Sequence, residues 1–127
     1  METSRSSVFG GTALAVSVHA AMLILAAAFV MFGLPKVMRV YESAEVALPA
    51  ATMLAVNIMQ SVQHYWWLMM PLVVLFLALD GVIHFSLRKS ARPGFAATWS
   101  LLVTAVQGAV IALLVALTCM PLRGIAG

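Results

Sequence analysis

The chain has 127 residues, of which 64% are hydrophobic and 9% are charged. A soluble domain of this size could not bury so much apolar surface, because the interior of a small domain is limited. The composition therefore excludes an ordinary soluble domain and predicts one membrane domain over residues 9–127. The net charge of +3 comes from scattered Lys and Arg residues rather than from a basic run, so nucleic acid is not an expected partner.

The chain is predicted to begin with a polar tail, residues 1–8, followed by a spanning helix over about residues 9–32. About 20 mostly apolar residues suffice to cross a bilayer. This stretch is longer than the apolar core of a signal peptide, so we interpret it as a retained helix. Pro35 is expected to end the helix, because proline removes a backbone hydrogen bond.

Small residues recur at every fourth position in the first and third spans. Such spacing lets helix backbones approach closely, so it predicts that these two spans pack together; alternatively, it reflects only how common alanine is in membrane helices. The residues are Ala13, Ser17 and Ala21 in the first span and Gly108, Ala112 and Ala116 in the third.

The segment between the first two spans is predicted to leave the hydrocarbon and then form an amphipathic helix. Residues 36–45 carry two basic and two acidic side chains. Pro49 suits the first turn of a helix, which is predicted over about residues 49–63 and either lies in the interface or continues into the second span. Its polar stripe is Asn57, Gln60, Ser61 and His64, and its apolar stripe is Leu54, Ile58 and Val62.

The second and third spans are predicted over about residues 65–87 and 95–120. Aromatic and basic side chains at helix ends favour the membrane surfaces. They predict interface anchors at Tyr65, Trp66, Trp67, Arg88, Lys89 and Arg92. The basic residues of the 88–94 connection place it and the N-terminus in the cytoplasm, and the C-terminus in the periplasm.

Asp80 is the only acid predicted within a span, and an unpaired charge there costs a few kcal/mol. His84, His19 and Gln107 fall near it, which predicts an intramembrane polar cluster. Such a cluster could relay a proton, or two histidines could ligate a haem. The simpler interpretation is that Asp80 pairs with His84 or Arg88 and fixes helix packing. We expect no catalytic, cofactor-binding or metal-binding residues, since no nucleophile with a base, phosphate loop or metal constellation is present.

A series of short phrases resembles a known family. Their residues are Phe29 and Val30, then Pro35 and Lys36, then Leu48, Pro49 and Thr52, then Tyr65, Trp66 and Trp67, with Met120, Pro121 and Leu122 near the end. In this order and spacing they resemble the inner-membrane platform proteins (F-type) of type II secretion systems and type IV pili. The resemblance implies a periplasmic location for the phrases between the first two spans.

Members of that family carry cytoplasmic helical bundles where this chain has residues 1–8 and the 88–94 connection. The resemblance therefore covers the membrane portion only, and direct contact with an assembly ATPase is not expected. It implies no functional site residues, because the matching positions are helix ends.

These patterns predict an all-α, multi-pass protein of the bacterial inner membrane with three transmembrane helices. It is expected to act without enzymatic activity or cofactor, as a scaffold or accessory subunit of a larger assembly. Its expected partners are the lipid bilayer and either other membrane subunits or further copies of itself. The alternatives are the membrane anchor of a redox enzyme, binding haem or quinone through membrane histidines, and a small transporter or channel subunit, for which no inverted repeat is visible.

Overall fold

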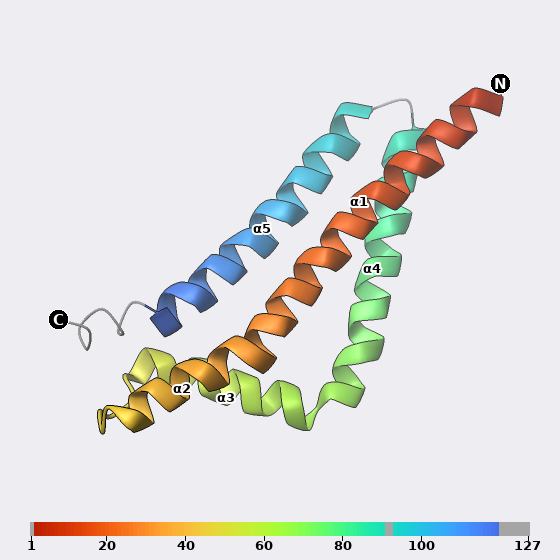
Figure 1. The fold of residues 1–127 in the computed structure, drawn as a ribbon. Helices are drawn as coiled ribbons and strands as arrows, with labels where there is room; N and C mark the ends of the chain where they lie inside the picture. Colours follow the sequence, from red (N-terminus) through yellow and green to blue (C-terminus); the bar gives the residue numbers. More distant parts are fainter. Residues whose placement is uncertain (1, 91–92, 120–127) are drawn as a thin grey trace. The chain divides into compact units, whose positions relative to one another are not determined.

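The computed structural model describes residues 2–90 and 93–119, with side chains described for residues 6–90 and 94–119. Over these ranges every element is a helix (Figure 1). Three helical segments are long and apolar enough to cross a membrane, Ser6–Ser43, Trp66–Lys89 and Gly94–Cys119. This confirms the predicted all-helical class. The elements are α1 (Glu2–Ala28), the π-helical turn η1 (Phe29–Gly33), α2 (Leu34–Ser43), α3 (Ala50–His64), α4 (Trp66–Lys89) and α5 (Pro93–Cys119).

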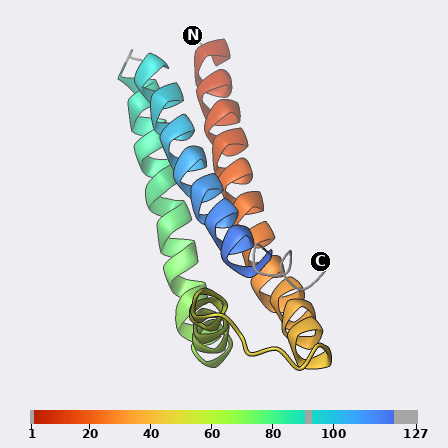
Figure 2. The same ribbon diagram turned by 90° about the vertical axis from the view of Figure 1, so that its left-hand side faces the viewer.

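The helices form two compact units. Unit 1 contains Met1–Leu23 and Met70–Gly108, and unit 2 contains Ile24–Met69 and Ala109–Gly127. In unit 1, parts of α1, α4 and α5 run side by side (Figures 1 and 2). The predicted polar tail belongs to α1, which is helical from Glu2 onward.

Close packing in unit 1 uses a different face of α1 from the one predicted. Ala13, Ser17 and Ala21 are exposed, whereas Ala15 and His19 are buried. Gly108 of α5 does face α1, since a Cβ on it would lie 3.7 Å from Met22 Cε, an ordinary contact.

The helical path does not end at Pro35, contrary to the prediction. The N–H of Leu34 donates to the carbonyl of Phe29, five residues earlier, so the chain widens into a π turn just before the proline. Pro35 then occupies the first turn of α2, where its missing N–H costs little. The wider turn allows one continuous helical segment to contain a proline, as π-bulges do.

α2 ends in a Schellman turn closed by Glu45. The N–H of Val46 donates to the carbonyl of Tyr41 at 3.2 Å, and the N–H of Glu45 donates to the carbonyl of Glu42 at 3.2 Å. Glu45 has a φ of 53°, a left-handed conformation that helix ends usually assign to glycine.

α3 is a separate helix that stops one residue before α4. Tyr65 is the non-helical residue between them, and its N–H donates to the carbonyl of Ser61 at 2.9 Å. Tyr65 has a φ of −106° and a ψ of 23°, outside the helical region, so α3 does not continue into α4 without interruption.

The buried face of α3 differs from the predicted apolar stripe. Thr52, Ala55, Val56 and Met59 are buried. Leu54 and Ile58 are exposed by 55% and 39%, while the predicted polar stripe is exposed as well. Ala55, Val56 and Met59 pack with Val30 and Leu34 to form the apolar core of unit 2. Hydrophobicity alone therefore does not identify the inner face of α3, since Leu54 and Ile58 are exposed while Thr52 and Ala55 are buried.

Candidate functional site

A buried pair of ionisable side chains lies at the centre of unit 1. His19 of α1 is completely buried and Asp80 of α4 is 2% exposed. Nδ1 of His19 lies 2.6 Å from Oδ2 of Asp80 and donates to it. The carboxylate thus has a charge-assisted partner when the imidazole is protonated, which is how an acid at membrane depth is tolerated.

The second oxygen of Asp80 is also bonded. The indole Nε1–H of Trp99, on α5, donates to Oδ1 of Asp80 at 2.9 Å. One carboxylate therefore joins three helices through two hydrogen bonds. The sequence analysis did not include Trp99 in the cluster. The need of an indole N–H inside a span for an acceptor could have indicated it.

The other edge of the His19 ring faces Ser100 of α5. Nε2 lies 3.3 Å from the Ser100 carbonyl and 3.4 Å from its hydroxyl. Two protonation states fit this geometry: a neutral ring accepts from the hydroxyl, and a protonated ring donates to the carbonyl. In both states the ring is bonded on both nitrogens, so His19 is fixed between α4 and α5.

Gln107 belongs to the same cluster through the backbone. Its Nε2 donates to the carbonyl of His19 at 3.4 Å, while its Oε1 is buried without a hydrogen-bond partner among the described residues. His19, Asp80, Trp99, Ser100 and Gln107 are called the His19–Asp80 cluster below.

His84 and Arg88 lie elsewhere on α4 and do not pair with Asp80, contrary to the simpler interpretation. Nδ1 of His84 lies 3.2 Å from the hydroxyl of Thr12. The guanidinium of Arg88 donates to the carbonyl of Ser7 at 3.0 Å and lies against Gly11, where a Cβ would overlap it. Among the described residues the His19–Asp80 contact is the only ion pair. The sequence could not distinguish the histidines, because both fall close to Asp80 along the helices.

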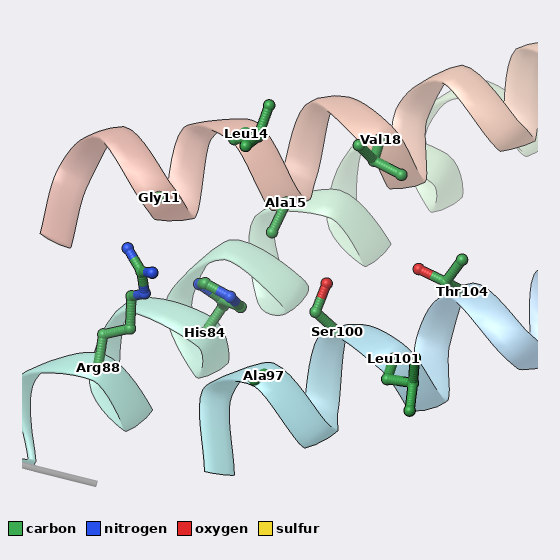
Figure 3. A pocket seen from close by; sticks show the side chains of 10 residues that line it. All are labelled: Gly11, Leu14, Ala15, Val18, His84, Arg88, Ala97, Ser100, Leu101 and Thr104. Atoms are coloured by element: carbon green, nitrogen blue, oxygen red, sulfur yellow. The ribbon is translucent and has the colours of Figure 1, made fainter. Parts of the chain in front are cut away.

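Beside these residues, unit 1 has a groove of about 410 Å³ between α1 and α5 (Figure 3). Its walls are mostly apolar, and His84 and Arg88 of α4 lie at one end. Ser100 and Thr104 point from α5 toward α1. The groove is called the Arg88 groove below.

The described residues include no group of three or more His, Cys, Asp or Glu side chains that could hold a metal ion. Haem ligation requires an imidazole nitrogen with open space in front of it, whereas His19 is fully buried and bonded at both nitrogens. The cluster is therefore suited to joining helices rather than to holding a cofactor.

The predicted interface anchors differ in exposure. Tyr65, Trp66 and Trp67 are exposed by 47%, 63% and 61%. Lys89 is exposed and Arg88 is half-buried. Arg92 lies outside the described residues.

Fold and site together define a helical protein with three segments able to span a membrane and a closed polar cluster between them. Comparison with family models, with curated proteins and with solved structures finds no match for this chain.

Proposed function

We propose that this protein is a non-enzymatic scaffold or accessory subunit of a larger assembly in the bacterial inner membrane. The His19–Asp80 cluster carries the proposal. Its side chains bond α1, α4 and α5 to one another, so these polar groups serve helix packing. The Asp80 carboxylate is bonded at both oxygens and the His19 ring at both nitrogens, and polar groups satisfied in this way fix structure and have little capacity for chemistry.

A second support is the exposure of apolar side chains on all three spanning helices. Ile24, Leu75 and Leu113 are each more than half exposed in the single chain, by 69%, 55% and 59%. Such surfaces contact lipid or other membrane helices, and packing is what joins helices in lipid. The single chain therefore offers ample helix surface to partners or to further copies of itself.

The finer proposal is that the assembly is a secretion or pilus machine, with this protein similar to the membrane part of a platform protein. Its support is the series of phrases between the first two spans. Val30 lies in the core of unit 2, Pro49 precedes the first residue of α3, and the Thr52 hydroxyl donates to the Leu117 carbonyl at 3.2 Å. These positions hold helices together, which fits a structural role.

The orientation follows from the basic residues at the end of α4. We propose that the connection after Lys89 is cytoplasmic, that α3 is on the periplasmic side, and that the C-terminus is periplasmic. Reporter fusions after Ser90 and after Glu45 test this: the first should be active only with a cytoplasmic reporter, and the second only with a periplasmic one. The opposite pattern would reverse the assignment.

The function is tested by isolating the tagged protein from its native membranes in a mild detergent. The protein should run in a complex with other membrane subunits at a fixed ratio, well above the 13.5 kDa of a single chain. Its absorption spectrum should lack a Soret band. A monomer would contradict the scaffold. A Soret band that follows the protein through purification would contradict it as well and would favour the redox anchor.

A further inference from the structure

The Arg88 groove combines an apolar channel with a cationic end. Leu14, Ala15 and Val18 of α1 form one side. Ala97, Leu101 and Thr104 of α5 form the other. The lining runs from Gly11 to Val18 on α1 and from Ala97 to Thr104 on α5. Each stretch covers seven residue steps, which corresponds to about 10 Å at about 1.5 Å per residue. The space has the length and apolar character to hold part of an acyl chain.

Arg88 supplies the charge at the end of the groove. Its guanidinium makes one hydrogen bond, to the Ser7 carbonyl, although the group has several N–H donors. One helical turn away, His84 is bonded to Thr12 through Nδ1 and makes no hydrogen bond through Nε2 within the described residues. Figure 3 shows both side chains beside the groove. Arg88 thus has donors available to an anion. The Thr12 hydroxyl donates to the Val8 carbonyl, so Nδ1 of the buried His84 donates to Thr12, and His84 lines the groove without a second donor in its neutral form.

No acid of unit 1 neutralises Arg88 within the described residues. Asp80 is bonded to His19 and Trp99, and Glu42 and Glu45, the other acids whose side chains are described, belong to unit 2. Gly11 leaves room for the guanidinium, since any side chain there would overlap it. None of the acids with a described side chain therefore supplies the charge complement of this site.

The position of Arg88 identifies the source of that anion. It lies in the last turn of α4, next to Lys89, where a spanning helix reaches the headgroups. From this end the groove extends past Leu14 and Leu101 toward the middle of both helices. Basic pockets between transmembrane helices at the membrane surface suit anionic lipid headgroups.

We propose that the Arg88 groove binds one anionic phospholipid. Its phosphate accepts hydrogen bonds from Arg88, and one acyl chain lies along the groove between α1 and α5. This inference does not depend on the scaffold function, because it concerns a lipid rather than a protein partner.

The test is native mass spectrometry of delipidated protein in detergent, titrated separately with phosphatidylglycerol, phosphatidylcholine and inorganic phosphate. One phosphatidylglycerol should bind with a clear preference over phosphatidylcholine, and inorganic phosphate should neither bind measurably nor displace the lipid. Equal retention of both lipids would overturn the proposal. Equal binding of inorganic phosphate would overturn it as well, because the site would then be an anion site without a chain channel.

Two matched pairs of variants locate the site. Arg88→Gln should weaken phosphatidylglycerol binding about tenfold, since it removes charge-assisted hydrogen bonds. Lys89→Gln removes the same charge from an exposed neighbour and should change binding by about threefold or less. Thr104→Trp should also weaken binding about tenfold, by displacing the chain, because Thr104 lines the groove and points from α5 toward α1.

The control for Thr104→Trp is Leu102→Trp, an exposed residue two positions earlier on α5 that does not line the groove. It should bind the lipid as the natural protein does. The proposal fails if Arg88→Gln binds unchanged, or if the two tryptophan variants behave alike. Because the two pairs probe the headgroup and the chain separately, a variant that fails to fold leaves the other pair decisive.

Discussion

Unit 1 and unit 2 hold their helices together by different means. Unit 1 uses a buried carboxylate that binds an imidazole and an indole from two other helices. Unit 2 uses a small apolar core, built by Val30, Leu34, Ala55, Val56 and Met59, with one hydrogen bond from Thr52 to α5. The hydrophobic effect does not favour helix association in lipid. A carboxylate with two directional hydrogen bonds therefore suits the long helices of unit 1, and an apolar core suits the shorter α2 and α3.

The largest expected effect tests the polar side of this comparison. Asp80→Leu leaves His19 and Trp99 without their acceptor inside unit 1. It should lower the free energy of unfolding by about 3 kcal/mol, since breaking a buried pair by removing one partner is costly. Unfolding by SDS titration in mixed micelles measures this change in free energy. The emission of Trp99, in a variant that also carries Trp66→Phe and Trp67→Phe, reports unit 1 alone.

A double-mutant cycle with His19→Leu provides the control. The double variant should lose clearly less than the sum of the single variants, because neither partner is then left unpaired. Additive losses, or an unchanged unfolding curve for Asp80→Leu, would show that the pair contributes little and that unit 1 is held by packing alone.

The apolar side of the comparison is tested by Met59→Ala in unit 2. Met59 is 7% exposed and lies in the core, so truncation should leave a cavity and cost about 2 kcal/mol. Hydrogen exchange of the α3 backbone amides reports this unit and leaves the His19–Asp80 cluster unchanged. Met53→Ala is the matched control, because Met53 is 45% exposed on the same helix and its truncation should change stability little. Equal losses for the two variants would contradict the assignment of the core.

The helical class and the spans are predictable from the sequence because membrane length and hydropathy determine them. The pairing within the site is less predictable. His84 lies one turn from Asp80 on α4, and depth in the membrane places His19 near both, but the way α1 packs against α4 decides which histidine bonds to Asp80. Trp99 could be expected to need an acceptor, but nothing in the sequence identifies which one.

Three local features of unit 2 depend on backbone geometry that the sequence does not display. The π turn before Pro35 lets the helix continue, although proline usually ends one. Glu45 adopts a conformation usually left to glycine. The inner face of α3 carries Thr52 and Ala55 rather than the bulkier Leu54 and Ile58, because small residues permit close contact with the neighbouring helices.

The single polar contact of unit 2 gives a smaller effect. Thr52→Val keeps the shape of the side chain and removes the donor to the Leu117 carbonyl. The loss should be about 1 kcal/mol, as for other hydrogen bonds between membrane helices. Thr98→Val is the control, since the Thr98 hydroxyl bonds only the Gly94 carbonyl within its own helix and is exposed. A loss above that of Met59→Ala would mean that unit 2, like unit 1, depends mainly on polar contacts.

The smallest expected effect is a gain. Glu45→Gly removes the steric cost of a left-handed residue at the end of α2, while the two hydrogen bonds of the Schellman turn involve backbone atoms and remain. The free energy of unfolding should rise by about 0.5 kcal/mol, because the greater freedom of glycine in the unfolded chain offsets part of the relief. Glu42→Gly removes the same charge from within α2 and should instead destabilise by about 1 kcal/mol. The opposite signs at two neighbouring glutamates separate backbone geometry from charge, and a loss at both positions would show that Glu45 contributes through its side chain.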